Sequence, residues 1–273
     1  MHTLLPGYHM ESSDWSRPGV AVEFLRAAAK LHREMQLPCT IFVRGQTMED
    51  HPCEFRAARD LCGELMDFQQ ATYSNLPLKT VCRQDHQGTT LFETATLPQC
   101  RDDIARASDV MERVLGARPE GLAGPLGYYR GLSDRPDLLE MLARLGIRFT
   151  RTWTRNQFDA FPVPFEQQPF FYTAQGFPEL LEIPAQGWPE TAWKAAPGFE
   201  APEKFVRQMK KDLDYVAAKG LVWGWALTDW SCIHKDVEMR STRAVLEQAR
   251  EQEFRILTHA QFQREKIAAM GAA

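Results

Sequence analysis

Apolar and polar residues alternate along this chain in a way that predicts short strands separated by longer helices. Apolar residues recur at helical spacing in segments that are predicted to be helices: residues 20–35, 55–65, 98–115, 137–145, 202–219 and 241–253. Short apolar runs between them are predicted to be strands: residues 39–43, 147–150, 180–183, 221–227 and 255–258. This order indicates parallel strands joined by right-handed crossovers.

A β/α barrel fits this alternation better than an open sheet, because no glycine-rich phosphate-binding turn follows the first predicted strand. At 273 residues the chain is long enough to bury one sizeable core. We therefore expect a single α/β domain over residues 1–273. The segment of about residues 152–193 is rich in proline, glycine and aromatic residues, and we expect it to cover the strand ends, where barrels carry their sites.

Charge and hydropathy exclude several classes of function. The formal net charge of −4 and the pI near 6.0 argue against binding to nucleic acid or to an anionic membrane. The sequence has no apolar run of the length, about 18 residues, that a transmembrane helix needs. Residues 1–7 lack the charged and apolar regions of a signal peptide. We therefore expect a cytoplasmic protein that binds neither nucleic acid nor a membrane.

The cysteines are scattered without C-x-x-C spacing: Cys39, Cys53, Cys62, Cys82, Cys100 and Cys232. Reduced thiols in a cytoplasmic protein explain this pattern better than a disulfide framework does. A cytoplasmic location also makes a small molecule a better candidate substrate than a cell-wall polymer.

The most informative stretch runs from Asp67 to Thr80 and reads D-F-Q-Q-A-T-Y-S-N-L-P-L-K-T. It resembles the second motif of the polysaccharide deacetylases (the NodB-homology family), in which a strand end carries His-Thr-Tyr-Ser-His and both histidines bind a divalent metal. Ala71 and Asn75 stand at those two positions here. Ala71 has no donor atom, and the neutral amide of Asn75 is a poor ligand for a zinc-type ion.

The resemblance covers most of the chain in the right order. Residues 38–45, P-C-T-I-F-V-R-G, resemble the strand A-T-F-F-V-x-G, and residues 182–184 resemble a later E-I-P strand. Residues 122–127 lie where an Arg-x-Pro-x-Gly motif is expected, with Ala123 at the arginine position. Residues 225–228 resemble the late Leu-x-His motif, with Thr228 in place of the histidine. The resemblance implies a distorted (β/α) barrel, although the departures fall at the active positions.

The first motif of the family supplies an aspartate base and a metal-binding carboxylate. The nearest match here is His9-Met10-Glu11, which keeps a carboxylate at Glu11 and places His9 at the base position. With both metal-binding histidines replaced, at most one strong ligand remains. We therefore predict no catalytic metal and no cofactor, although an ion weakly held by Glu11 and Asn75 stays open.

Three residues are the candidates for acid–base chemistry. His9 has an ordinary pKa of about 6.5 and could act as a base or an acid near neutrality. Glu11 could orient His9, hold a substrate ammonium group or act as the base. Asp229 directly follows Thr228 and would face the same end of the barrel. The structural alternatives are a surface histidine for His9 and turn caps for the two carboxylates.

A further set of polar and aromatic residues is predicted to bind substrate: Asn75, Tyr128, Arg130, Trp188, Trp230 and His234. Arg130 lies between tyrosine and glycine residues and could hold a carboxylate or phosphate in a forked geometry. An ion pair with Asp134 or Asp137 explains Arg130 equally well. The aromatic residues are explained as readily by packing. His259, near the last predicted strand, is a weaker site candidate than His9.

The sequence therefore predicts a metal-independent hydrolase that cleaves a C–N bond of a small amide, as some allantoinases of the family open cyclic amides. The alternative is a pseudoenzyme, which would bind a sugar or amide ligand or a partner protein without turnover. The combined loss at Ala71, Asn75, Ala123 and Thr228 favours that alternative. An engineered Ala71 would leave the other three losses unexplained. Aromatic loops also leave room for a homo-oligomer.

Overall fold

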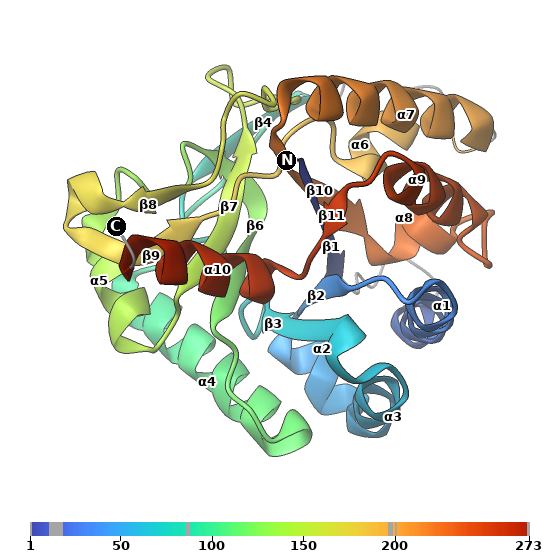
Figure 1. The fold of residues 1–273 in the computed structure, drawn as a ribbon. Helices are drawn as coiled ribbons and strands as arrows, with labels where there is room; N and C mark the ends of the chain where they lie inside the picture. The colour runs from blue at the N-terminus through green and yellow to red at the C-terminus, as the bar shows by residue number, and fades with distance from the viewer. Residues whose placement is uncertain (1, 11–18, 86–87, 196–198, 200, 272–273) are drawn as a thin grey trace.

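The computed structural model describes residues 2–10, 19–85, 88–195, 199 and 201–271 (Figure 1). Glu11, one of the predicted catalytic residues, lies outside these ranges. Among the described helices, none is long and apolar enough to cross a membrane.

Nearly all strands join one sheet, in the order β10-β1-β2-β3-β6-β7-β9-β8, with β11 also paired to β1. Its members are β1 (Thr3–Met10), β2 (Cys39–Val43), β3 (Met66–Gln70), β6 (Gly121–Tyr129), β7 (Phe149–Arg155), β8 (Phe170–Tyr172), β9 (Phe177–Glu182), β10 (Val222–Thr228) and β11 (Arg255–Ile256). Neighbouring strands are parallel except for β8 and β9. A separate hairpin pairs β4 (Val81–Asp85) with β5 (Gly88–Phe92).

The helices surround this sheet (Figure 1). They are α1 (Val20–Met35), α2 (Gly45–Asp50), α3 (Pro52–Cys62), α4 (Leu97–Leu115), α5 (Pro136–Arg144), α6 (Glu190–Ala195), α7 (Pro202–Lys219), α8 (Asp229–Ile233), α9 (Arg240–Glu251) and α10 (His259–Gly271), with short 3-10 turns at Gly63–Leu65 and Thr173–Gln175. The helices predicted over 20–35 and 202–219 are confirmed at both ends. The others are confirmed within a few residues.

The expected distorted (β/α) barrel is confirmed, and the distortion has a physical basis. Within the described residues, no strand pair joins β10 to the far side of the sheet. Two glutamine amides bridge this gap instead. Gln168 accepts from the Val222 N–H at 2.8 Å and donates to the Val222 carbonyl at 2.9 Å. Gln186 Oε1 accepts from Gly224 N at 2.7 Å.

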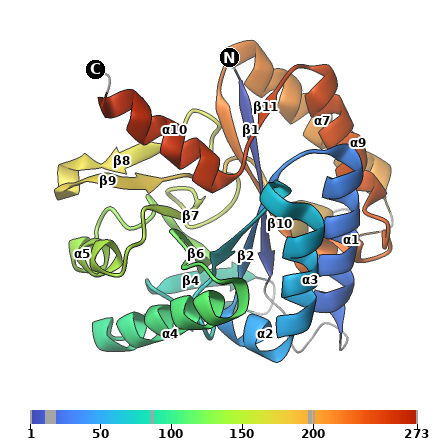
Figure 2. The ribbon, with the colours of Figure 1, turned by 60° about the horizontal axis from the view of Figure 1, so that its bottom comes forward.

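Alternation along β1 divides the core into an inner and an outer layer. Leu4 and Tyr8 pack outward against the helices, whereas Leu5 points into the barrel beside Phe42 and Phe149. Because side chains alternate faces along a strand, Gly7 and His9 share the inward face with Leu5. Helix α10 crosses the end of the barrel where β1 begins, so the carboxyl ends of the strands form the opposite end (Figure 2).

The segment of about residues 152–193 is not a simple cover. Its first residues complete β7, and it contains β8 and β9, which belong to the main sheet. The buried Glu182 carboxylate fixes this part by accepting hydrogen bonds from β7 and β8. Its donors are Thr150 Oγ1, Thr152 N, Thr152 Oγ1, Trp153 N and Tyr172 OH, at 2.6 to 2.7 Å. These strands therefore form part of the barrel wall.

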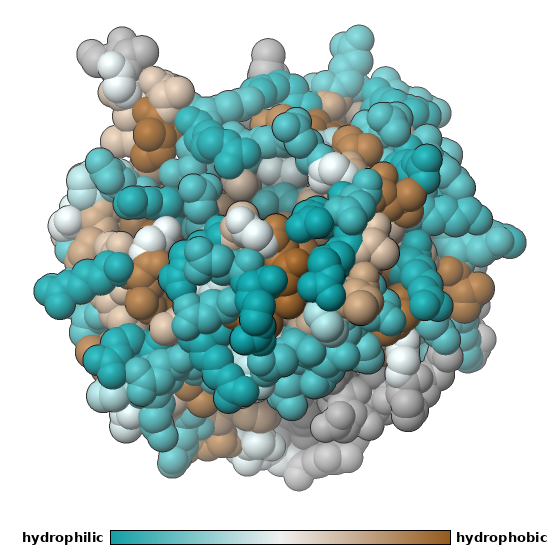
Figure 3. Space-filling view, turned by 90° about the horizontal axis from the view of Figure 1, so that it is seen from below, coloured by the Kyte–Doolittle hydropathy of each residue, from teal (hydrophilic) through white to brown (hydrophobic). Residues whose placement is uncertain are grey.

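Figure 3 shows the molecule from below the view of Figure 1. This face is largely hydrophilic, with hydrophobic residues in separated patches. The exposed large apolar side chains of the described chain are Leu61, Leu91, Tyr129, Phe158, Tyr215, Val237 and Met270. Isolated exposed apolar side chains of this kind are normal on soluble proteins.

Candidate functional site

His9 lies near the carboxyl end of β1, where the site of a barrel is expected. Its backbone pairs with Phe42 on one side and Thr228 on the other. The side chain is only 8% exposed. His9 is therefore a buried residue at the barrel mouth and not the surface histidine of the structural alternative.

Arg151 on β7 is the nearest charged partner of His9 in the described structure. Phe149 packs inside the barrel, so Arg151, two residues on, faces inward as well. Its Nη1 donates to the Gly7 carbonyl at 3.0 Å, and its Nη2 lies 3.4 Å from His9 Nδ1. The guanidinium also lies over the Phe42 ring, 4.6 Å from the ring centre. Arg151 thus reaches across the barrel interior from β7 to β1.

Burial and the positive charge of Arg151 lower the pKa of His9 to about 3, while a contact with Asn75 opposes this shift. At neutral pH the His9 ring is therefore uncharged. This corrects the expectation of a pKa near 6.5, because both desolvation and a neighbouring cation disfavour the imidazolium form. His9 can donate or accept a hydrogen bond at neutral pH, but it carries no proton to give as an imidazolium.

His259, the first residue of α10, lies inside the barrel beside Gly7 of β1. Its ring contacts Phe42 edge-on at 5.1 Å and stacks on Phe149 at 6.3 Å. Burial and the charge of Arg151 lower its pKa well below the ordinary value. Within the described structure, neither ring nitrogen of His259 has a hydrogen-bond partner.

One of the two positions that the resemblance assigns to metal-binding histidines, and the position that it assigns to an arginine, are apolar in this barrel. Ala71 and Ala123 are both fully buried in the inner core cluster with Leu5 and Phe42. Across the described residues, no group of three His, Cys, Asp or Glu side chains is arranged to hold a metal. An alanine offers no donor atom and Arg151 adds a positive charge, so the described residues do not fit a zinc-type ion.

Asp229 and Asn75 complete the mouth. Asp229 begins α8 directly after Thr228, whose backbone pairs with His9, and it is fully buried. Asn75 follows β3 in a left-handed conformation (φ 65°), and its Oδ1 has no hydrogen-bond partner in the described part of the chain. The structure thus brings three predicted site residues to one end of the barrel.

Tyr128 and Arg130 are not part of this group. Tyr128 is 1% exposed, and its hydroxyl accepts from Leu78 N at 2.8 Å beside the pocket that Arg130 also lines. Arg130 is exposed and lines a separate pocket of about 460 Å³. The two aspartates considered as its partners are engaged elsewhere, because Asp134 pairs with Lys79 and Asp137 pairs with Arg135.

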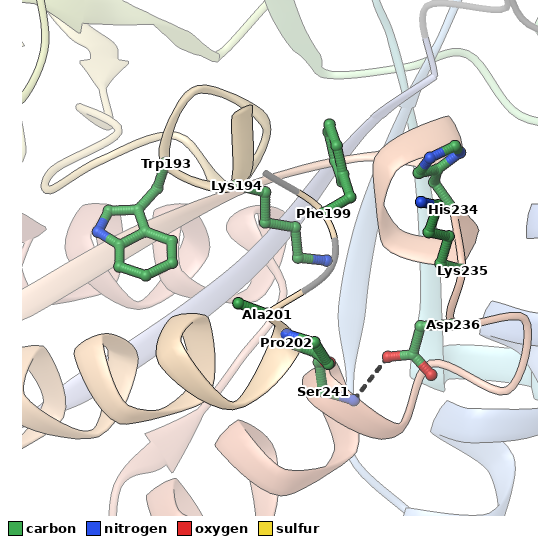
Figure 4. Close-up of a pocket in the computed structure, with 9 residues that line it drawn as sticks. All are labelled: Trp193, Lys194, Phe199, Ala201, Pro202, His234, Lys235, Asp236 and Ser241. Carbon is green, nitrogen blue, oxygen red and sulfur yellow. Dashed lines mark hydrogen bonds between the residues drawn. The ribbon is translucent and has the colours of Figure 1, made fainter. Parts of the chain in front are cut away.

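The remaining predicted substrate-binding residues contact other aromatic side chains. His234 is exposed and contacts the Phe199 ring at 4.9 Å, in a small pocket beside α6 and α9 that also includes Lys194 (Figure 4). Trp230 contacts the same Phe199 ring at 5.5 Å. Trp188 packs against Phe161 at 6.5 Å. Packing contacts account for these aromatic side chains.

Arg151 is the residue that the sequence reasoning missed. A signal was present, because the strand F-T-R-T-W-T-R places an arginine in phase with the buried Phe149. A charged residue at a core-facing position is uncommon unless it is paired or functional. Moreover, Arg151 pairs in register with Ala123, the position where the family resemblance predicts an arginine.

No protein-family model and no curated protein sequence matches the chain. Solved structures do match it. A candidate polysaccharide deacetylase from Mycobacterium smegmatis superposes with a TM-score of 0.71 at 16% identity, covering 98% of this chain and 91% of that one. The chain has the polysaccharide deacetylase fold. The PuuE allantoinase is also similar, with a TM-score of 0.66 at 15% identity over 96% of this chain and 88% of that one.

The same fold occurs in a protein described as a pseudoenzyme. This CE4-family protein from Bacillus anthracis matches with a TM-score of 0.57 at 10% identity, covering 96% of this chain and 65% of that one. A mutant of that protein is described as having restored enzymatic activity. The polysaccharide deacetylase fold is therefore compatible with either activity or its loss, and the residues of the site must decide between them.

Proposed function

We propose that the protein is a deacetylase-like hydrolase that cleaves the C–N bond of a small amide without a catalytic metal. The observation that carries this proposal is the contact between Arg151 and His9 at the barrel mouth. It supplies positive charge and a hydrogen-bond donor at the end of the barrel where Ala71 and Ala123 replace the family's polar side chains. Positive charge and donors stabilise the oxyanion that forms when water attacks an amide.

His9 acts in this proposal as a neutral donor. Arginine can only donate hydrogen bonds, so His9 Nδ1 is the acceptor of the Arg151 contact and the ring proton resides on Nε2. A neutral imidazole N–H can polarise a substrate carbonyl, as the electrophilic histidine of triosephosphate isomerase does. Arg151 strengthens this donor by withdrawing electron density at Nδ1.

The carboxylates move the protons in the proposed reaction. One carboxylate takes a proton from the attacking water, and a protonated group donates to the leaving nitrogen. Among the described residues, Asp229 is the candidate for this proton transfer, because it is buried beside the end of β10. Glu11 is the second candidate by resemblance to the first motif, and it lies outside the described residues.

The test is hydrolysis of a panel of small acyclic and cyclic amides in the presence of a chelator, with release of amine as the readout. We expect turnover by the natural protein and at least about a hundredfold loss in His9→Ala and in Asp229→Asn. Arg130→Ala is the matched control, since Arg130 lines a different pocket. Equal turnover by all these proteins would contradict the proposed site.

A pseudoenzyme is the second candidate, and burial favours it. His9 is 8% exposed and Asp229 is fully buried, whereas a working site must admit substrate. The similarity to the Bacillus anthracis pseudoenzyme supports the same alternative. Binding of an amide from the panel without release of amine would establish this candidate over the hydrolase.

The setting of the reaction is also proposed. We place the protein in the cytoplasm, acting on a small molecule and not on a nucleic acid or a membrane, in keeping with its net charge of −4. A homo-oligomer is part of the same proposal. Light scattering coupled to size exclusion tests it, because a protein of 31.2 kDa would then elute at a multiple of that mass.

A further inference from the structure

We propose that the pocket beside Arg130 is a second ligand site, which binds the carboxylate or phosphate group of a small aromatic anion. The pocket has a volume of about 460 Å³, within the usual range for small-molecule sites. Its walls are the end of β6, the turn after it, and segments that follow β3 and β7. It lies at the carboxyl end of these strands, but neither His9 nor Asp229 lines it, so it is separate from the amide site.

Arg130 supplies the charge of this site. Its side chain is exposed, and within the part of the chain that the structure describes it forms no hydrogen bond and no ion pair. The two aspartates nearest to it in the sequence are neutralised by other cations, Asp134 by Lys79 at 2.6 Å and Asp137 by Arg135 at 2.7 Å. All the guanidinium donors therefore remain available, and a carboxylate or phosphate accepts from two of them at once.

The other charges that line the pocket are balanced. Lys79 uses its three N–H groups on Asp134 and on two backbone carbonyls of the turn after β6. Asp159 Oδ1 lies 3.7 Å from Arg155 Nε. Among the described residues, Arg130 is thus the one charge at the pocket without an opposite partner, and the charge left over is positive. A positive pocket of this kind selects an anion.

The turn after β6 fixes the direction in which Arg130 leaves the backbone. Arg130 has a left-handed conformation (φ 58°), which is uncommon for a residue with a side chain. Its carbonyl accepts from Ser133 Oγ at 2.8 Å and from Ser133 N at 3.2 Å, and Lys79 Nζ donates to the next carbonyl, that of Gly131, at 3.0 Å. A backbone held in this way loses little further entropy when a ligand binds.

Exposed aromatic rings accompany the guanidinium. Tyr129 lines the pocket, is 41% exposed, and is supported edge-on by Trp153 at 6.1 Å. Phe158 is 79% exposed and stands between two lining residues of the loop after β7. Asn156 Oδ1 accepts from the Phe158 N–H at 2.9 Å and so ties that loop. An exposed ring beside an unpaired guanidinium suits an anion that carries a planar apolar ring.

The experiment is an NMR titration of the full, ¹⁵N-labelled chain at pH 7 with four probes: benzoate, phenylphosphonate, inorganic phosphate and benzyl alcohol. We expect at least one aromatic anion to bind about tenfold more tightly than neutral benzyl alcohol, because a hydrogen bond to a charged group supplies such a factor. Phenylphosphonate should bind about threefold more tightly than inorganic phosphate, because its ring contacts Tyr129. The comparison of benzoate with phenylphosphonate distinguishes the two possible anionic groups.

Three variants test the residues. Arg130→Met should reduce the affinity for the anions to that for benzyl alcohol, and Arg130→Lys should retain part of the preference. Tyr129→Ala should remove the advantage of phenylphosphonate over inorganic phosphate. Arg144→Met is the matched control, because it makes the same change in net charge at an exposed arginine of α5 that pairs with Glu140 and does not line the pocket.

Each outcome decides. Tighter binding of an aromatic anion, with shifts in the backbone signals of Arg130 and Gly131 and a loss in Arg130→Met but not in Arg144→Met, establishes the site. Equal binding of anions and benzyl alcohol, or an equal loss in the two methionine variants, overturns it. Inorganic phosphate that binds as tightly as phenylphosphonate overturns the part assigned to Tyr129. Amide hydrolysis is not a readout here, so the site stands or falls independently of the proposed function.

Discussion

At the scale of single residues, the barrel mouth is governed by the effect of one side chain on the protonation of another. Arg151 and His9 are 142 positions apart in the chain, yet their side-chain nitrogens lie 3.4 Å apart. A fixed cation at this distance disfavours the imidazolium form of His9, and burial acts in the same direction. His9 is consequently a neutral group at pH 7.

Arg151→Met should raise the pKa of His9. The substitution removes the positive charge but leaves the ring buried, so the pKa should rise from about 3 and remain below 6.5. An NMR titration of labelled histidine measures the change. Arg155→Met, which removes a charge from the same strand but not from His9, should leave the titration unaltered; a shift of equal size in both variants would contradict a direct effect of Arg151.

His32 is a second buried histidine, and we expect its protonation to lower the stability of the folded protein in acid. Its Nδ1 donates to the Leu37 carbonyl at 2.9 Å, and its Nε2 accepts from the Tyr8 hydroxyl at 2.8 Å. Burial lowers the pKa of His32 to about 4. Because the folded-state pKa is below the ordinary value of 6.5, the unfolded chain takes up the proton first, and stability falls as the pH drops from 6.5 to 4.

The expected loss from His32 over this range is roughly 3 kcal/mol in the free energy of unfolding. His32→Gln should therefore show a smaller difference in stability between pH 7 and pH 4 than the natural protein, whatever its stability at pH 7. Urea unfolding at the two pH values measures this difference. A fall as steep in the variant as in the natural protein would assign the acid sensitivity to other groups, such as His9 and His259.

At the scale of elements, a buried ion pair holds α6 against α8. Lys194 and Glu190 form an ion pair within α6, Ser231 of α8 donates to Glu190, and Lys194 Nζ donates to the Ser231 carbonyl at 3.3 Å. Burial disfavours the Lys194 ammonium, but the Glu190 carboxylate outweighs that effect and raises the pKa of Lys194. Since α8 begins with Asp229, this network also fixes one wall of the site.

Lys194→Met should destabilise the protein by about 3–5 kcal/mol, because it leaves the Glu190 carboxylate buried without its cation. The double variant Glu190→Gln/Lys194→Met should recover much of that loss, since no charge is then buried alone. Denaturant unfolding of both variants gives the comparison. If the single variant is no less stable than the double one, the ion pair does not hold α6 in place.

The elements that were predicted well from the sequence are those with a clear amphipathic or apolar pattern. Helices α1 and α7 have one apolar face each, and their ends were predicted correctly. Strand β6 was not predicted, because G-L-A-G-P-L-G-Y-Y contains glycine and proline, which normally argue against a strand. Helix α10 lacks a clear apolar face, so its pattern led to no prediction.

At the scale of the whole molecule, ordered motifs predicted the barrel, while the site depended on contacts that no motif contains. The strand-end positions of His9, Asn75 and Asp229 followed from the order of the motifs, and the structure places these residues at one end of the barrel. The approach of Arg151 and His259 to Gly7 depends on the folded barrel, because these residues come from β7, α10 and β1.

The central claim is that this barrel performs amide chemistry with a guanidinium and a neutral imidazole in place of a metal. The most direct measurement is elemental analysis of the protein purified without chelator, repeated after dialysis against zinc, with amide hydrolysis assayed on both samples. We expect far less than one ion per chain and the same activity before and after zinc. One tightly bound ion per chain, or activity that appears only with zinc, would contradict it.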